Sequence, residues 1–191
     1  MTLATYGCLG NSITYGYGAT DPDHAYPVRA GVPRIGYPGQ ALTIAIWWDS
    51  MLVTFPDEIQ QMLAAGVGIV VTEIGINDLN VNQGITDADM EAGYHQLQVM
   101  GAKWDIRVIL STITPWGANR PGNTPAMAKQ RTRLNTWIRT HKYHVDYAHA
   151  LGGSVMLPKY DSGDQLHPNN KGHKAMADCL TAFIAKHRFK A

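Results

Sequence analysis

Residues 69–74 read I-V-V-T-E-I, and this almost unbroken apolar stretch decides the fold class. A strand that faces water on one side alternates apolar and polar residues, whereas a strand covered on both sides does not. The stretch stops before Gly75, and the polar residues Asn77 and Asp78 follow it. We therefore expect a central strand that is buried on both faces and ends at a polar edge of a sheet.

Shorter β-prone runs and longer stretches of helical period alternate on both sides of this strand. We expect strands at 3–9, 107–112 and 145–147, and a weaker one at 32–35, where Pro33 cannot donate to a ladder. Helices are expected at 47–65, 87–100, 125–141 and 170–187, the first broken at Pro56 and the second running from an N-cap at Thr86 to Gly101. This order predicts an α/β fold in one domain over residues 1–191, with three α/β/α layers around a mostly parallel, flavodoxin-like sheet. Ligands bind such sheets outside the carboxyl ends of the strands.

The composition excludes several classes of partner. Only 16% of the 191 residues are charged, and 16 basic against 15 acidic side chains give a net charge of +1. That balance offers no basic surface to a phosphate backbone, so no nucleic acid is expected to bind. No apolar run reaches the length of a membrane span, and residues 1–9 lack the positive charge of a signal peptide. We expect a soluble protein, either cytoplasmic or secreted with a leader that is absent from this chain.

Cysteines and histidines do not indicate a metal centre. Cys8 and Cys179 lack the paired spacing of a zinc site and are expected to be reduced thiols, with a single disulfide between them left open. His141, His144 and His149 lie close together in the sequence, but their polar surroundings favour exposed side chains. No metal ligand set is predicted.

Two polar clusters near the ends of the chain contain the groups of a nucleophilic site. Ser12 follows the first expected strand at the start of a helix, where N–H groups stabilise negative charge, although a serine hydroxyl needs a neighbouring base to attack. Asp164 and His167 share one loop at positions i and i+3, so the carboxylate can hold Nδ1–H and leave Nε2 to take a proton. Each cluster also has an ordinary structural explanation, as a helix cap or as a capped turn beside an exposed imidazole.

Two further clusters offer donors for negative charge that would form during such an attack. Asn77 follows the central strand and carries a side-chain N–H. In I-G-Y-P-G-Q at 35–40, the backbone N–H of Gly39 can approach a ligand closely, and Gly36 is an alternative. A βα turn and a Pro-Gly turn would explain these two clusters without any function.

Together and in this order, the four clusters resemble the four sequence blocks of the SGNH hydrolases, also called GDSL-type esterases and lipases. The matching stretches are G-N-S-I-T-Y-G at 10–16, I-G-Y-P-G-Q at 35–40, G-I-N-D at 75–78 and D-Q-L-H-P-N at 164–169. Two features depart from the family pattern. Asn11 stands where the first block usually has Asp, and Pro33 and Arg34 stand where the second block usually opens with Asn.

The resemblance implies the SGNH hydrolase fold and a serine hydrolase that cleaves carboxylic esters through an acyl-enzyme, without a metal or organic cofactor. Ser12, His167 and Asp164 would form the catalytic triad. The backbone N–H groups of Ser12 and Gly39 and the side chain of Asn77 would form the oxyanion hole.

The substrate implied is a small-molecule or carbohydrate ester, with short acyl or acetyl groups preferred over lipids, which would require a broad apolar patch. Trp116, in the long loop at 115–125, has the strongest claim to contact substrate, followed by Tyr37 and Asp78. Trp47 and Trp48 are expected to pack at the start of a helix. The oligomeric state is not indicated.

Two other classes of protein share the predicted fold. A flavin-binding module would hold a phosphate with Ser12, Thr14 and Gly16, which leaves Asp164 and His167 without a role. A non-catalytic carbohydrate-binding domain is the other alternative, because the fold alone does not specify turnover.

Overall fold

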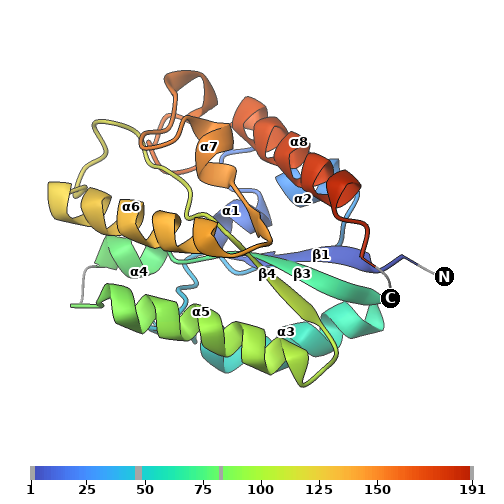
Figure 1. The fold of residues 1–191 in the computed structure, drawn as a ribbon. Coiled ribbons are helices and arrows are strands. Elements are labelled where there is room, and N and C mark those ends of the chain that lie inside the picture. Colours follow the sequence, from blue (N-terminus) through green and yellow to red (C-terminus); the bar gives the residue numbers. More distant parts are fainter. Residues whose placement is uncertain (1–2, 46–48, 82–83, 190–191) are drawn as a thin grey trace.

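Five parallel strands form the sheet at the centre of the computed structural model, which describes residues 3–45, 49–81 and 84–189 (Figure 1). The strands are β1 (Thr5–Gly10), β2 (Arg34–Gly36), β3 (Val67–Glu73), β4 (Arg107–Ser111) and β5 (His144–Val145). Their order is β2-β1-β3-β4-β5, and each neighbouring pair is parallel. This is the doubly wound order of the flavodoxin-like folds, as the alternation of elements predicted.

Helices cover both faces of the sheet. One face packs against α3 (Met51–Ala64), α5 (Asp87–Ala102) and α6 (Pro125–Thr140), with α4 (Ile76–Val81) at its edge. The other face packs against α1 (Ser12–Tyr15), α2 (Tyr26–Arg29), α7 (Tyr147–Leu151) and α8 (Asn170–Lys186). Figure 1 shows α8, α7 and α2 above the sheet and α3 and α5 below it. Two 3₁₀ turns, η1 (Pro22–His24) and η2 (Pro158–Tyr160), lie in the connecting loops.

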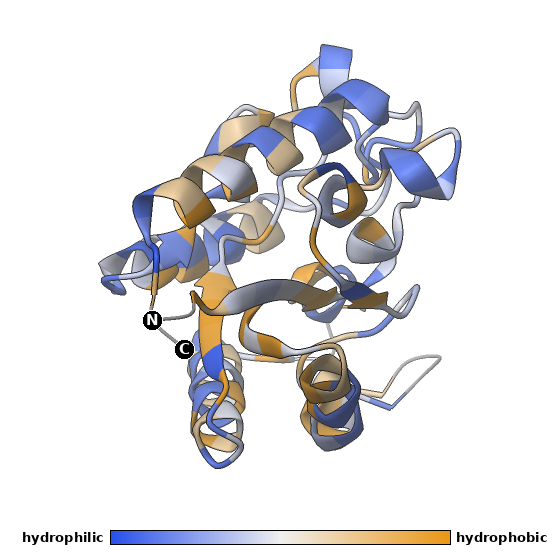
Figure 2. Cartoon of the chain, turned by 90° about the vertical axis from the view of Figure 1, so that its right-hand side faces the viewer, coloured by the Kyte–Doolittle hydropathy of each residue, from blue (hydrophilic) through white to orange (hydrophobic). Residues whose placement is uncertain are grey.

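Strand β3 contributes to a hydrophobic core on each side of the sheet. Val70 lies in the core beneath α3, α5 and α6, whereas its neighbour Val71 lies in the core beneath α2, α7 and α8, and both side chains are fully buried. In Figure 2 the strands carry much of the hydrophobic colouring, whereas the helices carry both hydrophobic and hydrophilic residues. The prediction of a central strand buried on both faces is confirmed, and it explains why the stretch at 69–74 does not alternate.

Several predicted boundaries differ from the structure. Helix α3 continues through Pro56, because its buried stripe, which includes Phe55 and Ile59, outweighs the loss of one backbone donor. Helix α5 includes Gly101, where a Cβ atom would lie 2.5 Å from a Val108 methyl group, so glycine permits close packing on β4. Tyr147 begins α7 instead of ending a strand.

The structure also bears on the expectations for the two tryptophans, the two cysteines and membrane spans. Trp47 and Trp48 lie outside the described residues. Cys8 and Cys179 are both free thiols, and burial raises the pKa of Cys8 to about 12. Across the described ranges, no helix combines the length and the apolar character needed to cross a bilayer.

A fully buried carboxyl group ends β3 directly beside the serine loop. The backbone carbonyl of Glu73 accepts hydrogen bonds from the backbone N–H and the side-chain Nδ2 of Asn11, both at 3.4 Å. The Thr114 hydroxyl lies 3.4 Å from Glu73 Oε1, whereas Oε2 has no hydrogen-bond partner within the described part of the chain. Burial raises the pKa of Glu73 to about 8, although Thr114 and Asn11 partly oppose that rise. Glu73 is therefore a neutral acid in the folded protein at pH 7.

We expect the stability that Glu73 contributes to be fully present below pH 4.5 and to be lost as the pH rises through about 8, because only the unfolded chain can ionise it easily. Each pKa unit corresponds to about 1.4 kcal/mol, so the loss amounts to about 5 kcal/mol. Urea unfolding of wild type and Glu73→Gln at several pH values measures this loss in the free energy of unfolding. The neutral variant should lack this decline, and parallel curves for the two proteins would contradict the assignment.

Candidate active site

Residues from five separate parts of the chain line one cleft at the carboxyl edge of the sheet. The cleft has a volume of about 430 Å³. Its lining residues are Ser12, Tyr17, Pro38, Gly39, Asn77, Asn80, Val81, Arg120, Leu166 and His167. The location agrees with the rule that ligands bind beyond the carboxyl ends of parallel strands.

Ser12 is the first residue of α1, directly after β1. The side chain of Asn11 caps this short helix by accepting a hydrogen bond from the Ile13 N–H at 2.8 Å. Gly10 permits the close turn, since a Cβ atom there would lie 2.3 Å from both the Glu73 carbonyl and the Thr14 hydroxyl. The turn leaves the Ser12 side chain at the cleft with 8% of its surface exposed.

The replacement of the usual Asp by Asn11 has a physical reason in this chain. The amide oxygen caps α1, and the amide Nδ2 donates to the Glu73 carbonyl. An ionised aspartate could only accept, and it would also place a negative charge beside the buried Glu73 carboxyl group. Asn11 therefore holds the Ser12 loop through hydrogen bonds without adding a charge beside the Glu73 carboxyl group.

Asp164 and His167 form a hydrogen-bonded loop that presents the imidazole to Ser12. His167 Nδ1 lies 2.5 Å from Asp164 Oδ2, and His167 Nε2 lies 2.9 Å from Ser12 Oγ. Because an ionised carboxylate only accepts hydrogen bonds, the proton is assigned to Nδ1, and Nε2 is left to accept from the hydroxyl. The Ser162 N–H closes the loop by donating to the His167 carbonyl at 3.0 Å.

The Asp164 carboxylate is stabilised in its charged form. Partial burial raises its pKa, but hydrogen bonds from the backbone N–H and ring of His167 and from the Leu166 N–H outweigh burial and lower the pKa to about 2. Both backbone donors lie 2.8 Å from Oδ1. Asp164 is therefore ionised near neutral pH and can stabilise a positive charge on the imidazole.

The other wall of the cleft carries hydrogen-bond donors. Asn77, in the first turn of α4, donates Nδ2 to the Gln40 carbonyl at 2.8 Å, which ties α4 to the loop containing Gly39. Gly39 has a φ of +86°, a conformation that favours glycine. Within the described ranges, the backbone N–H groups of Ser12 and Gly39 donate to no protein acceptor. Gly36 does not line the cleft, because it packs against the backbone of α1.

Two of the three expected substrate contacts are corrected by the structure. Trp116 is only 1% exposed and packs on the Arg131 guanidinium, whose centre lies 4.3 Å from the ring centroid. Asp78 is also buried, and its carboxylate accepts the backbone N–H groups of Leu42 and Thr43 at 2.7 and 2.8 Å. Both residues support loops around the cleft instead of lining it. Tyr37 is half-buried beside the lining residue Pro38, and its contact with substrate stays a prediction.

Tyr17, an aromatic residue that the sequence places in a loop at the mouth of the site, lies at the cleft, whereas other residues that shape the cleft were missed. The half-exposed Tyr17 ring lies 5.4 Å from the His167 ring. The buried His173 holds the Tyr17 loop, because its Nε2 lies 2.9 Å from the Tyr17 carbonyl. Burial lowers the pKa of His173 to about 4, so this imidazole is a neutral structural link. Arg120 and Asn80 were also missed, since nothing in their spacing marks them.

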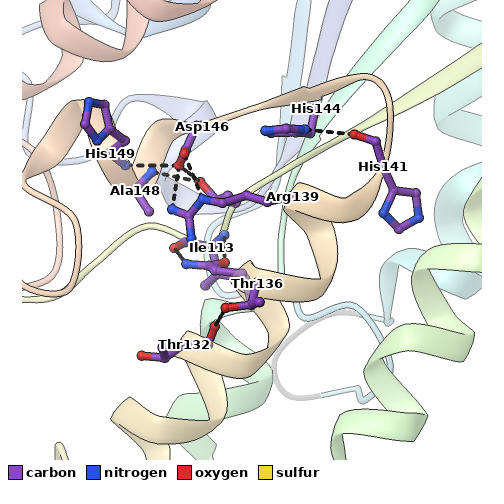
Figure 3. A network of polar contacts seen from close by, with 11 residues as sticks. Ile113, Thr132, Thr136, Arg139, His141, His144, Asp146, Ala148 and His149 are labelled. Atoms are coloured by element: carbon purple, nitrogen blue, oxygen red, sulfur yellow. Dashed lines mark hydrogen bonds and ion pairs between the residues drawn. The ribbon is translucent and has the colours of Figure 1, made fainter.

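The three clustered histidines do not converge on a common point (Figure 3). His144 Nδ1 contacts the His141 carbonyl at 3.0 Å, and the neighbouring Asp146 is paired with Arg139 and caps α7. Among residues 3–45, 49–81 and 84–189, no group of three or more potential ligand side chains is arranged to hold a metal ion.

Comparison with known proteins identifies the family. The model of the GDSL-like lipase/acylhydrolase family matches residues 8–175. No curated protein matches the chain significantly.

Several solved structures share the fold. A carbohydrate acetylesterase family member from Sinorhizobium meliloti has a TM-score of 0.76 at 15% identity, over 96% of this chain and 98% of that chain. A GDSL-like lipase from Bacteroides thetaiotaomicron has a TM-score of 0.73 at 21% identity, over 95% and 88%. The aryl esterase of M. smegmatis has a TM-score of 0.72 at 15% identity, over 96% and 99%.

These likenesses agree with the parallel sheet and its two helical layers. The family match covers all four sequence blocks and begins within β1, leaving out Thr5, Tyr6 and Gly7 of that strand. The chain therefore belongs to the GDSL-like lipase/acylhydrolase family and is an ester-cleaving hydrolase of that family.

Proposed function

We propose that the protein cleaves short carboxylic esters, including acetyl esters of carbohydrates, through a Ser12–His167–Asp164 triad and an acyl-enzyme. The observation that carries this proposal is the continuous path from Ser12 Oγ through the His167 ring to Asp164, with steps of 2.9 and 2.5 Å. A hydroxyl, a base and an orienting carboxylate in this geometry are the parts that acyl transfer needs.

In the first half of the reaction, His167 Nε2 takes the Ser12 proton as Oγ attacks the ester carbonyl. The charge on the imidazole is stabilised by Asp164, whose low pKa keeps it ionised. The N–H groups of Ser12 and Gly39 and the Asn77 amide would hold the tetrahedral oxyanion. His167 then protonates the leaving alcohol, and the acyl group stays on Ser12.

In the second half, water enters the place of the alcohol. His167 Nε2 removes its proton, the resulting hydroxide attacks the acyl carbonyl, and the same oxyanion donors hold the second tetrahedral intermediate. Collapse of that intermediate breaks the ester bond to Ser12, the proton returns to Oγ, and the carboxylic acid leaves.

The cleft supports a small substrate. A volume of about 430 Å³ is in the range of ordinary small-molecule sites. The names of two structural neighbours, a carbohydrate acetylesterase family member and an aryl esterase, are consistent with short acyl groups. The flavin alternative is not favoured, because Thr14 is fully buried and contacts the Tyr26 hydroxyl at 2.9 Å instead of facing a ligand.

Replacing the nucleophile tests the chemistry. We expect Ser12→Ala to retain the wild-type thermal transition and to lose at least about a thousandfold in kcat, since no other group can form the acyl-enzyme. The assay uses 4-nitrophenyl acetate, butyrate and octanoate together with an acetylated sugar, and wild type should prefer the short acyl groups. A folded Ser12→Ala protein with wild-type rates would end the proposal.

Replacing the side-chain donor tests the oxyanion hole separately. Asn77→Ala removes one donor that acts on the developing charge, and we expect kcat to fall about a hundred- to a thousandfold with a smaller change in KM. Because Asn77 also binds the Gln40 carbonyl, the thermal transition of the variant is measured beside its kinetics. A well-folded variant whose kcat stays within threefold of wild type would remove Asn77 from the oxyanion hole.

A further inference from the structure

One permanently charged side chain lines the cleft. Among the described lining residues, Arg120 is the single arginine, and no lysine or carboxylate accompanies it. The other lining groups are apolar, neutral polar or the His167 imidazole. An unbalanced cation at this position favours a substrate with a negative charge.

The guanidinium of Arg120 has most of its donors available. Nη1 donates to Asn80 Oδ1 at 2.6 Å, and this is the one side-chain hydrogen bond that Arg120 makes within the described ranges. Two arginines elsewhere are paired with carboxylates, Arg133 with Asp87 and Arg139 with Asp146. Within the described residues, no carboxylate forms an ion pair with Arg120. A guanidinium with free donors can bind a carboxylate through two parallel hydrogen bonds.

Asp164 influences Arg120 electrostatically but forms no ion pair with it. Asp164 attracts the guanidinium electrostatically, but its oxygens already accept hydrogen bonds from Ser162, Leu166 and His167. Partial burial lowers the pKa of Arg120, although Asp164 partly opposes that change. An anion in the cleft would replace the lost solvation.

Arg120 is also fixed relative to the catalytic loop. The Gly117 N–H donates to the Gln165 carbonyl at 2.8 Å, and the Asn119 N–H donates to Gln165 Oε1 at 2.7 Å. Gln165 lies between Asp164 and His167, so the loop that carries Arg120 is bonded to the loop that carries the base. A preorganised cation loses little entropy when it binds an anion.

We infer that Arg120 forms an anion subsite of the ester cleft and that the preferred substrates are esters carrying a carboxylate. This inference rests on the proposed function, because it names the substrate class for the same site. The carboxylate would receive the free guanidinium N–H groups while the ester carbonyl lies against Ser12.

The test compares matched anionic and neutral esters. The first pair, 4-acetoxybenzoate and 4-acetoxybenzamide, places the charge on the leaving group. The second pair, the monophenyl ester of adipic acid and its amide, places the charge on the acyl side. For wild type, Arg120→Gln and Arg133→Gln, the measured quantity is the ratio of kcat/KM for the anionic ester to kcat/KM for its neutral partner. Arg133 is an exposed arginine outside the cleft, so its variant controls for the change in net charge.

We expect the ratio for at least one pair to fall about ten- to a hundredfold in Arg120→Gln and to stay at the wild-type value in Arg133→Gln. Equal ratios in wild type and Arg120→Gln for both pairs would overturn the inference. Should Arg120→Gln not fold, benzoate and benzamide are compared as competitive inhibitors of wild type with a neutral ester. Benzoate should inhibit at least about tenfold more strongly, and equal inhibition would overturn the inference as well.

The two proposals fail in distinguishable ways. If wild type cleaves the neutral esters, Ser12→Ala does not, and the ratios are unchanged by Arg120→Gln, then the triad stands and the anion subsite is wrong. If Ser12→Ala cleaves all four esters as wild type does, the triad itself is wrong.

Discussion

The 2.9 Å contact between Ser12 Oγ and His167 Nε2 joins residues that are 155 positions apart, and the rest of the site depends on it. The parallel sheet makes the contact possible, because β1 and β3 deliver Ser12 and Asn77 to the same edge. The loop that precedes α8 then brings the imidazole to that edge. Each end is held by backbone hydrogen bonds, through Asn11 at the serine and through Asp164 at the histidine. The proposed nucleophile and base are therefore positioned before any substrate arrives.

Two acids, the exposed Asp164 and the fully buried Glu73, support this contact in opposite protonation states. Asp164 receives two backbone N–H groups and a ring N–H, so it remains charged and orients the base. Glu73 has few donors and no access to water, so it remains neutral beneath the serine loop. Asn11 suits that neutral neighbour better than the aspartate usual at its position. The negative charge of Asp164 thus lies next to the His167 imidazole, whereas the turn that carries Ser12 has only the neutral Glu73 beneath it.

The sequence was sufficient to predict those parts of the fold and site that depend on short apolar patterns and short motifs. The apolar run at 69–74 and the helical periods predicted the layers, and the four motifs predicted which side chains the carboxyl edge brings together. Side-chain burial was predicted poorly, because it depends on distant partners. Trp116 lies in a Gly/Pro-rich loop but is covered by Arg131 from α6, and Asp78 is enclosed by the backbone at 42–43. The position of Arg120 in the cleft could not be predicted from the sequence for the same reason. Helices α1 and α4 are too short to show a helical period in the sequence.

The most direct test of the central claim is peptide mass spectrometry after reaction of the folded protein with a fluorophosphonate. A serine activated by a neighbouring base displaces fluoride and forms a stable phosphonyl ester, whereas an ordinary surface serine does not react. We expect one adduct per chain, located on the peptide that contains Ser12, and a much slower reaction in His167→Ala. An adduct on a different residue, or no adduct on a protein that is demonstrably folded, would contradict it.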